Sequence, residues 1–544
     1  MGSKQPRPAG IDRRQFITGA SAVAALVVTG CSGDDGGGGA GSAGTGSSTT
    51  ASASNQTSTT LHSAKLAADP FTLGVASGDP LPDSVILWTR LAPDALAVDG
   101  RGGMPADAES VDVVWEVAAD DRFTQIVTSG VFTAEARHGH SVHVDASGLK
   151  PGTDHHYRFR VGEWQSPVGR ARTLPDGSAE RLRLAVANCQ MLETGAYAAY
   201  RHMAGQDLDL VLHLGDYIYE YPGVPGARPS LPETMVVSLA DYRLRYASYH
   251  LDPDLQAAHA RFPFVVTWDD HEVANNYMGD SVPGTGGSPQ EQLDRKAAAY
   301  QAWWENLPVR IDPPEGPALA VHRSFTVGDL ARLHVLDERQ HSEVPPCRPD
   351  PESTIDFGDC EAREGEDRTR LGADQEAWLE GSLAEGGVTW NLVGNPVVLA
   401  GVDSGAADGD AAYYLEVWDG FPQARNRLTE QLAGSSNPVV LTGDYHQGMV
   451  LDVHRTPFDM SSEVVAPEFM APPISSVLFG QDVSPRTPHL REQLNSHGYL
   501  SVEVTPDRLT ASFQVVADVT DAASAVTTAS TWTVDVGDPI TRRA

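Results

Sequence analysis

The sequence predicts an α/β domain preceded by an all-β segment, and three observations lead to this prediction. Between residues 70 and about 175, short stretches alternate apolar and polar residues and are separated by turn residues, which is typical of antiparallel strands. From Arg181 onward, apolar runs alternate with helix-like segments, which indicates a sheet flanked by helices. Four of those apolar runs end directly in Asp, His, Asn, Tyr or Cys.

The all-β segment is expected to span residues 69–175. Its strand candidates are "VILWTRL", "VDVVWEVAAD", "HSVHVDASGL" and "HHYRFRVG". The stretch "GLKPGTDHHYRF" resembles the E–F corner of an immunoglobulin or fibronectin-like β-sandwich. We therefore expect a small β-sandwich here, with "RTLPDG" as the linker that leaves it.

The second domain is expected to span residues 180–540. Its apolar runs are "LRLAVA", "LDLVLHL", "FPFVVTW", "RLHVLD", "TWNLVG" and "NPVVLTG". Its helix candidates are "GAYAAYRHMA", "PQEQLDRKAAAYQAWWENL" and "GADQEAWLEGSL". The stretches "GYLSVEVTPDRLTASFQVV" and "TWTVDVG" return the chain to strands near the C-terminus.

The N-terminal residues 1–31 are interpreted as an export signal. "DRRQFITGA" is a twin-arginine pattern, and the apolar stretch behind it is shorter than the ~20 residues of a spanning helix. "VTGC" resembles a lipobox ending in Cys31, and the alternative is an ordinary signal with a chance cysteine. Residues 32–68 are rich in Gly, Ser and Thr, which predicts a disordered tether. The sequence thus predicts passage through the twin-arginine translocon to a cell-surface lipoprotein or a secreted protein.

Charge and cysteine usage restrict the partners and the compartment. A net charge of −34 argues against a specific nucleic-acid partner, and against membrane binding other than through a lipid anchor. Cys347 and Cys360 bracket a turn-rich loop, so a disulfide between them is expected in an exported protein. Cys189 is left over, either as a small core residue or as a functional thiol.

Unusual polar residues follow four of the predicted strands. "LRLAVA" runs into Cys189, "LDLVLHL" into Asp216 and Tyr219, and "NPVVLTG" into Asp444 and His446. "FPFVVTW" runs into Asp269, Asp270 and His271, with Asn275 and Asn276 shortly after. Each motif alone is compatible with a cap, a turn or a core residue. Since ligands gather beyond the carboxyl ends of strands in α/β sheets, the four endings together predict a metal site.

The predicted donors suit hydrolysis at phosphorus. Asp216 can bridge two ions because a carboxylate has two oxygens. Two metals roughly 3.5–4 Å apart can clamp an in-line displacement, and a nearby His can protonate the leaving alkoxide.

These motifs resemble those of the PhoD-like alkaline phosphatase family, in the calcineurin-like metallophosphoesterase group. The resembling segments are "FTLGVASGDPLPDSVILWTRLAP", "NCQ", "GDYIYEY", "YRLRYASYHLDPDLQ", "TWDDHEVANNY", "LDERQ", "WDGFPQARNRL" and "TGDYHQG". The resemblance covers nearly all of the chain after the tether. It implies a four-layer α/β/β/α catalytic domain after the β-sandwich, and hydrolysis of phosphate-ester small molecules with ferric iron, Fe(3+), and calcium, Ca(2+).

The resemblance also implies roles for individual residues. Iron is assigned to Cys189, Asp216, Tyr219, Asp444 and His446, with Asp216 as the bridge, because phenolate and thiolate favour trivalent iron over zinc. Calcium prefers oxygen ligands, available from Asp216, Asp270, Asn276 and Asp444. His271 and Asp270 are the candidate catalytic residues, with His271 as proton donor or transition-state contact. The division of Asp444 and His446 between the ions stays open, and Asn276 is favoured over Asn275.

Other segments have weaker claims. Asp337 and Arg339 either support the site or form a buried ion pair, and Trp418 and Asp419 are taken as structural. Arg243 and Arg245 either meet phosphate or, as we favour, lie on a solvated helix face. His497 is a candidate for the rim of the site, and "EFMAPPISS" departs from the pattern expected there, which leaves the preferred ester open.

Two other functions compete with a phosphomonoesterase. A phosphodiesterase or phospholipase D-like enzyme would use the same metals, and a non-catalytic surface binding protein would suit the tether and the acidic surface. A zinc protease of the HExxH type and an α/β-hydrolase are disfavoured, because neither HExxH nor a GxSxG elbow is present.

Overall fold

The computed structural model describes residues 66–223, 228, 230–283, 286–345, 357–358, 361–405 and 411–544. The signal, most of the tether, Cys31, Cys347 and Cys360 lie outside the described residues, so the lipid site and the disulfide stay predictions. In the part of the chain that is described, no helix combines the length and apolarity needed to cross a bilayer.

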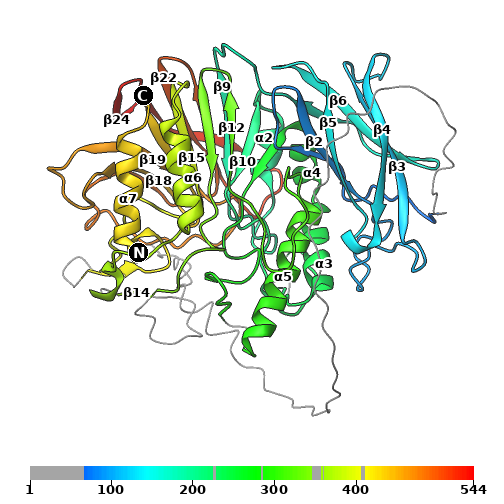
Figure 1. The fold of residues 1–544 in the computed structure, drawn as a ribbon, viewed down its shortest axis with the longest axis horizontal. Coiled ribbons are helices and arrows are strands. Elements are labelled where there is room, and N and C mark those ends of the chain that lie inside the picture. Colours follow the sequence, from blue (N-terminus) through cyan, green and yellow to red (C-terminus); the bar gives the residue numbers. More distant parts are fainter. Residues whose placement is uncertain are drawn as a thin grey trace, which may run out of the picture. The chain divides into compact units, whose positions relative to one another are not determined.

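Two large β-sheets pack face to face as the inner layers of the molecule (Figure 1). The first has ten strands in the order β24 (Asp538–Arg543), β23 (Val526–Asp535), β22 (Arg508–Val516), β21 (Gly498–Val504), β9 (Leu182–Ala187), β10 (Leu210–His213), β11 (Pro263–Val266), β1 (Ala76–Gly78), β2 (Ser84–Arg90) and β5 (Ser141–Ser147). The second has seven strands in the order β12 (Arg323–Val327), β13 (Ala331–Val335), β15 (Trp390–Asn395), β17 (Pro438–Thr442), β19 (Val464–Met470), β18 (Gly448–His454) and β20 (Leu490–Leu494).

Parallel strands form the centre of each sheet. β9, β10 and β11 run parallel in the first sheet, and β13, β15, β17 and β19 do so in the second. Their inner faces meet in one apolar core that includes Leu184, Leu212, Leu333 and Leu441. Because such strands are covered on both faces, they read in the sequence as nearly continuous apolar runs.

Helices cover the outer faces of both sheets. The four that pack in one core with the ten-stranded sheet are α2 (Ala198–Ala204), α3 (Leu239–His250), α4 (Pro253–Arg261) and α5 (Pro289–Asn306). Those that pack with the seven-stranded sheet are α6 (Ala373–Ala384) and α7 (Pro422–Ala433), in front of β15, β18 and β19 in Figure 1. The predicted α/β/β/α layering is therefore present.

The local sequence explains where the helices begin. Ser288 caps α5 by accepting from the backbone N–H of Glu291, whose carboxylate in turn accepts from the backbone of Ser288. Pro289 then occupies the first turn, where no intrahelical N–H bond is lost. α3 begins in the same way, with a reciprocal pair between Ser238 and Asp241.

The N-terminal β domain shares a sheet with the α/β domain. Its own sheet has the order β4 (Ile126–Glu135), β3 (Ser110–Ala118), β6 (Asp154–Val161) and β7 (Trp164–Gln165), with β8 (Gly169–Arg172) also paired to β6. Its other strands, β1, β2 and β5, extend the ten-stranded sheet, because β1 pairs in parallel with β11. The sequence prediction treated 69–175 as a separate sandwich and did not contain this pairing, since alternation along a strand does not say which strand lies beside it.

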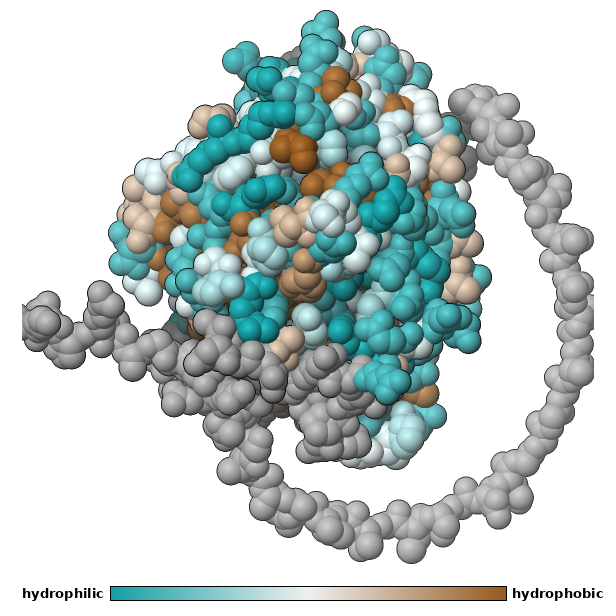
Figure 2. All heavy atoms as spheres, turned by 90° about the vertical axis from the view of Figure 1, so that its left-hand side faces the viewer, coloured by the Kyte–Doolittle hydropathy of each residue, from teal (hydrophilic) through white to brown (hydrophobic). Residues whose placement is uncertain are grey.

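Short elements complete the described chain. These are β14 (Phe357–Gly358), β16 (Tyr413–Tyr414) and the 3₁₀ turns η1 (Ala136–His138), η2 (Glu361–Glu364) and η3 (Trp418–Gly420). The face seen in Figure 2 is mostly polar, with apolar residues scattered among polar ones rather than gathered in one patch. This agrees with the strong excess of acidic residues in the sequence.

Asp79 joins the shared sheet to the rest of the α/β domain. Its fully buried carboxylate binds Arg323 through two bonds, of 2.7 and 2.9 Å, and accepts the backbone N–H of Arg310 at 2.7 Å. Breaking a buried ion pair leaves a buried charge uncompensated, which costs about 3 kcal/mol. We expect Asp79→Asn to lower the free energy of unfolding by about that amount in urea titrations.

The matched control for this prediction is Asp145→Asn. Asp145 also pairs with an arginine, Arg310, at 2.5 Å, but 55% of its side chain is exposed. Exposed pairs contribute about 1 kcal/mol or less, so this variant should unfold close to the parent protein. Equal effects of the two substitutions would contradict the role assigned to Asp79.

Candidate metal centre

Four strand ends deliver the predicted residues to one buried place. Cys189 follows β9, Asp216 follows β10, Asp270 follows β11, and Asp444 follows β17 of the other sheet. All four side chains are buried, with at most 7% exposed. The site therefore lies at the carboxyl ends of parallel strands from both sheets, where α/β proteins place their ligands.

The backbone at these strand ends is unusual. Of the ten described non-glycine residues with positive φ, five are predicted site residues: Cys189, Asp216, Asn276, Asp444 and His446, with φ between 53° and 65°. Such conformations are disfavoured for most residues and cluster at functional sites. Gly215 lets the backbone after β10 pass close to the backbone after β11, since a Cβ at this position would lie 2.3 Å from the backbone nitrogen of Asp269.

The first donor group consists of Cys189, Asp216 and His446. One possible ligand atom from each lies within 4.8 Å of the other two. Tyr219 joins them, since its hydroxyl donates to Asp216 Oδ2 at 2.8 Å and lies 3.2 Å from His446 Nε2. Thiol, carboxylate, imidazole and phenol thus meet, which is a donor set for a transition metal.

The tautomer of His446 follows from its other contact. Its Nδ1 lies 2.6 Å from the backbone oxygen of Val477, which can only accept, so Nδ1 carries the hydrogen. Nε2 then presents its lone pair toward Tyr219 and the donor group. Metal-binding histidines are commonly held in this way by a carbonyl behind the ring.

The second donor group consists of Asp216, Asp270 and His271, again with one ligand atom each within 4.8 Å of the others. Asp216 is common to both groups. The Nδ1 atom of His271 lies 2.7 Å from Glu220 Oε2. Nε2 is therefore the ring nitrogen that this contact does not occupy. Asp270 Oδ2 accepts the backbone N–H of Asn276 at 2.6 Å. Its other oxygen is buried and accepts no hydrogen bond from the described residues.

The two asparagines are arranged differently. Asn275 uses its backbone N–H to bind Glu220 at 2.8 Å, whereas Asn276 binds Asp270 and has a left-handed backbone. The charge of Asp444 is among those that raise the pKa of the Cys189 thiol, which indicates that this carboxylate lies near the thiol. All the residues predicted for the metals are therefore brought to one region.

The site gathers more negative than positive charge. Burial raises the pKa of the Asp216 carboxyl well above its ordinary value, with His271 opposing the rise and Asp270 adding to it. Burial and the neighbouring Asp216 also raise the pKa of the Cys189 thiol and of the Tyr219 phenol. All three groups resist ionisation together, so their anionic forms require a compensating cation.

Asp270 and His271 form the opposite case. Burial acts to raise the pKa of Asp270, but the positive charges of His271 and Arg339 outweigh it and lower that pKa. Burial acts to lower the pKa of His271, but the carboxylates of Asp270, Asp216 and Glu220 raise it well above the ordinary value. Asp270 is thus held as an anion beside a protonated imidazole.

Several supporting residues were not assigned roles from the sequence. Glu220 holds His271, and Glu272 accepts the backbone N–H groups of Asp216, Tyr217 and Asp269. Ser476 and Phe479 come from a distant loop; Ser476 contacts Tyr219, and the Phe479 ring stacks on His446 at 4.3 Å between centroids. Glu220 and Glu272 lie within the quoted motifs, so an acid beside a predicted ligand was the available signal. Ser476 lies in the quoted "EFMAPPISS", which the sequence analysis connected only with the preferred ester, and Phe479 gave no signal.

The "LDERQ" segment combines the two interpretations given for it, support of the site and a buried ion pair. Arg339 is fully buried and binds Asp269 at 2.5 Å, with Asp270 3.8 Å away. Asp337 Oδ1 accepts the backbone N–H of Arg339 and the indole N–H of Trp268. The arginine is therefore both an ion-pair partner and a neighbour of a predicted ligand.

Arg243 and Arg245 correct the sequence interpretation. We favoured a solvated helix face, but both side chains are buried, at 9% and 0% exposed. Arg243 forms an ion pair with the buried Glu305 at 2.6 Å. Arg245 donates to the backbone oxygens of Leu231, Pro232 and Tyr219. The alternation of arginine with apolar residues in "YRLRY" hid the fact that both faces are covered.

Trp418 and His497 take structural places near the centre. The Trp418 indole donates to Glu338 at 2.8 Å, and Asp419 pairs with Arg425 at 2.5 Å. His497 Nε2 lies 2.9 Å from the backbone oxygen of Ser476. It therefore reaches the donor group only through Ser476, whose side chain contacts Tyr219. The "PPISS" loop binds the strand end itself, since Ile474 donates to the Asn188 oxygen and Ser476 donates to the Cys189 oxygen.

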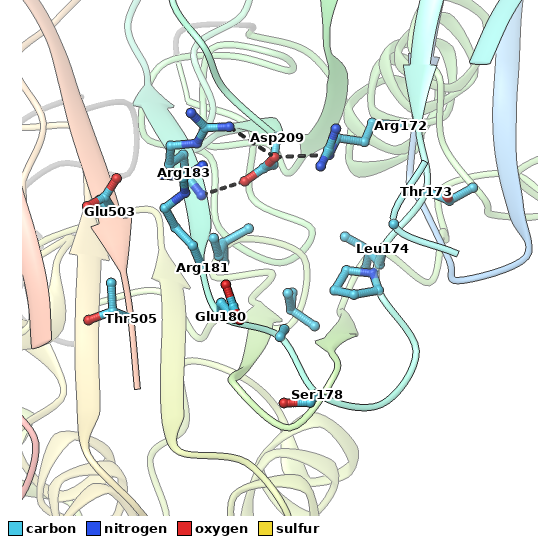
Figure 3. A pocket seen from close by; sticks show the side chains of 15 residues that line it. Arg172, Thr173, Leu174, Ser178, Glu180, Arg181, Arg183, Asp209, Glu503 and Thr505 are labelled. Atoms are coloured by element: carbon cyan, nitrogen blue, oxygen red, sulfur yellow. Dashed lines mark hydrogen bonds and ion pairs between the residues drawn. The ribbon is translucent and has the colours of Figure 1, made fainter. Parts of the chain in front are cut away.

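A pocket of about 620 Å³ lies away from these donors (Figure 3). Its lining includes Glu180, Arg181 and Asp209, which directly precede β9 and β10, so the pocket lies at the amino ends of these two strands. Asp209 lies between Arg172 and Arg183, at 3.0 and 3.8 Å. Acidic and basic side chains of the pocket therefore pair with each other. The pocket lies at the edge of the sheet opposite to the donor groups.

Comparison with known proteins identifies the family. The sequence model of the PhoD-like phosphatase matches residues 184–513, and that of its N-terminal domain matches residues 54–175. The chain belongs to the PhoD-like phosphatase family. It is 39% identical over 540 residues to alkaline phosphatase D of Bacillus subtilis (strain 168), covering 96% of this chain and 87% of that protein. A solved structure titled "Structure of PhoD" is 38% identical, with a TM-score of 0.83, and covers 89% of this chain and 93% of the other.

This PhoD-like phosphatase is accordingly a phosphoric ester hydrolase with a mixed α/β catalytic domain after an N-terminal β domain. The predicted family, fold class and enzyme class are confirmed, and the non-catalytic binding protein is set aside. PhoD-type enzymes depend on metals, and the two donor groups described above are the places in the described chain suited to hold them.

Proposed function

We propose that this protein is an exported phosphomonoesterase that uses ferric iron and calcium at two adjacent sites sharing Asp216. The observation that carries the proposal is that Asp216 belongs to both donor groups. A carboxylate with two oxygens can contact two cations, and paired cations stabilise both the attacking and the leaving oxygen at phosphorus. A single donor group would not support this reaction as well.

The first group suits iron. Thiolate, phenolate and imidazole donors come from Cys189, Tyr219 and His446, with carboxylate oxygens from Asp216 and Asp444. Hard calcium would avoid the sulfur, and the phenolate oxygen favours a trivalent metal. A strongly positive ion would also offset the ionised thiol and phenol, whose pKa values are raised in the protein alone.

The second group suits calcium. Asp216 and Asp270 provide carboxylate oxygens. Asn276 is the further oxygen donor that we assign, with Asp444 as a fourth where it is not taken by the iron. The backbone N–H of Asn276 binds Asp270, which places that residue beside the second group, whereas the backbone N–H of Asn275 binds Glu220 behind His271. This placement supports Asn276 as the ligand. His271 is held protonated by its carboxylate neighbours and is left out as a ligand, so the calcium site would be all-oxygen, as calcium prefers.

The chain's own residues then act on the substrate. The bound cations would withdraw charge from the phosphoryl oxygens and lower the pKa of a bound water. His271, oriented by Glu220 at 2.7 Å, is placed to hold a proton for the leaving alkoxide. The buried strand ends exclude bulk water from the donors, which strengthens their electrostatic effect.

A phosphodiesterase or phospholipase D-like activity is the second candidate. A diester carries one fewer ionisable oxygen, so the same donors serve it. Comparing kcat/KM for p-nitrophenyl phosphate and bis-p-nitrophenyl phosphate separates the two. A higher value for the diester would overturn the monoesterase assignment.

Export is proposed from the N-terminal sequence. The twin-arginine pattern and the lipobox predict translocation of the folded protein and attachment of lipid at Cys31, on the outer side of the membrane. Replacing Arg13 and Arg14 by lysine should leave the protein inside the cell, and Cys31→Ala should release it from the membrane fraction. Normal location of both variants would contradict the proposal.

The metals are tested on purified protein. Elemental analysis should find iron and calcium, and a phenolate bound to ferric iron should absorb visible light. A colourless, active protein that contains zinc alone would overturn the iron assignment while leaving the phosphatase assignment intact.

A further inference from the structure

The hydroxyl of Ser476 lies directly against the predicted phenolate ligand. Ser476 Oγ is 2.7 Å from Tyr219 Oη, 2.7 Å from the backbone oxygen of Cys189, and accepts the backbone N–H of Met191 at 3.1 Å. The side chain is fully buried. Nothing in the catalytic scheme above uses this group.

The loop that carries Ser476 is held firmly. The backbone N–H groups of Ser475 and Ser476 both bind the Cys189 oxygen, at 3.3 and 3.1 Å, and Ile474 binds the Asn188 oxygen at 3.0 Å. His497 binds the Ser476 oxygen from the other side at 2.9 Å. The position of the hydroxyl is therefore set by the backbone, and only the direction of its hydrogen is free to change.

Three polar atoms contact Tyr219 Oη, and only one of them can donate to a phenolate. Asp216 Oδ2, at 2.8 Å, can only accept when ionised. His446 Nε2, at 3.2 Å, is the ring nitrogen that we assign to the metal, and in the neutral ring it carries no hydrogen because the hydrogen is on Nδ1. Among these contacts the Ser476 hydroxyl is thus the donor that remains once Tyr219 has lost its proton.

We propose that Ser476 is a positioning residue that donates its hydroxyl hydrogen to the Tyr219 oxygen when that oxygen binds the metal, and thereby tunes how strongly the phenolate donates to iron. The inference rests on the proposed iron site. On metal binding, the O–H bond of Tyr219 would break and its proton would leave to solvent. The electron pair of that bond stays on the phenolate oxygen, which binds the metal. No electron is transferred in this step.

The hydroxyl has a choice of acceptor that the metal decides. A neutral Tyr219 gives its own hydrogen to Asp216, so the Ser476 hydrogen is available to the Cys189 oxygen. A phenolate is the stronger acceptor, because hydrogen bonds to ionised groups are roughly twice as strong as neutral ones. The Cys189 oxygen then keeps the two backbone N–H groups of the loop, so it is not left unsatisfied.

Removing this hydrogen bond has a predictable electronic effect. A hydrogen bond withdraws charge from a phenolate, as hydrogen bonds to a ligating sulfur tune other metal sites. Without it, the phenolate donates more strongly. The visible charge-transfer band should move to longer wavelength, and the reduction potential of the ferric ion should become more negative.

The test compares Ser476→Ala with Ser475→Ala in the metal-loaded protein. Ser475 is an equally buried hydroxyl one residue away, but it donates to the Met191 oxygen at 2.8 Å and not to Tyr219. We expect a red shift of the band and a lower potential in Ser476→Ala, and neither in Ser475→Ala. Ser476→Thr, which keeps the hydroxyl, should restore the parent band, and equal iron content should be verified for all variants.

The outcomes separate this inference from the proposed function. A parent protein without iron or a visible band overturns the iron site and the inference with it. A parent band that Ser476→Ala does not move, at equal iron content, overturns the inference alone. Equal shifts in both alanine variants would show that the loop acts through packing, which also overturns it.

Discussion

The variant Asp216→Asn is expected to lose on the order of 10³-fold or more in kcat/KM, together with bound metal at both sites. Asp216 is the residue that the two donor groups have in common. Metal ions provide several kcal/mol of transition-state stabilisation, and each 1.36 kcal/mol corresponds to a tenfold change in rate. Asparagine keeps the shape of the side chain and its tolerance of a left-handed backbone, so φ of 55° remains accessible.

The measurement pairs kinetics with elemental analysis, and the matched control is Asp209→Asn. Asp209 immediately precedes β10, whereas Asp216 lies beyond its other end, and Asp209 binds Arg172 and Arg183 instead of the donors. The control should keep its metals and activity within about twofold. If Asp216→Asn kept full metal content and activity, the shared-site proposal would be wrong.

The variant His271→Gln is expected to show a loss that depends on the leaving group. If His271 protonates the departing alkoxide, removing it should cost about 10²–10⁴-fold with an alkyl phosphate. p-Nitrophenolate is a stable anion that needs little protonation, so p-nitrophenyl phosphate should suffer far less, within about tenfold. The measurement is kcat for both esters in the parent and the variant at equal metal content.

The same comparison separates the two roles left open for His271. A transition-state contact to a phosphoryl oxygen would lower the rate for both esters alike, because the phosphoryl group is common to them. Glu220→Gln gives a graded second variant, since Glu220 touches His271 at 2.7 Å and not the donors of the first group. We expect it to lose about 10- to 100-fold, with the same leaving-group trend.

Much of the site was readable because its residues are local to strand ends. Cys189, Asp216, Asp270 and Asp444 each follow an apolar run that became a parallel strand. Burial of both faces makes such strands continuous in the sequence, and parallel strands bring their carboxyl ends to one edge. The residues at each strand end could therefore be identified from the segment itself, without knowing which strand lies beside it.

The supporting contacts were not readable in this way. Ser476 reaches Tyr219 across 257 positions of sequence, and Arg339 reaches Asp269 across 70. Arg243 and Arg245 looked solvated because a charged side chain does not reveal that a buried partner such as Glu305 awaits it. The pairing of β1 with β11 was hidden because the pattern along one strand does not show which strand lies beside it.

The amino-acid sequence by itself determined that an all-β segment precedes an α/β domain, the order of the strands along the chain and the chemical kinds of donor at their ends, because hydrophobic periodicity and strand-end motifs are local properties. The four layers were implied by the resemblance to the family. Only the tertiary structure decided that Asp216 belongs to both donor groups, which nitrogen of His446 faces them, and which hydroxyl reaches Tyr219. Those features depend on distances between residues far apart in the chain, which are set by how the two sheets pack and not by any one segment.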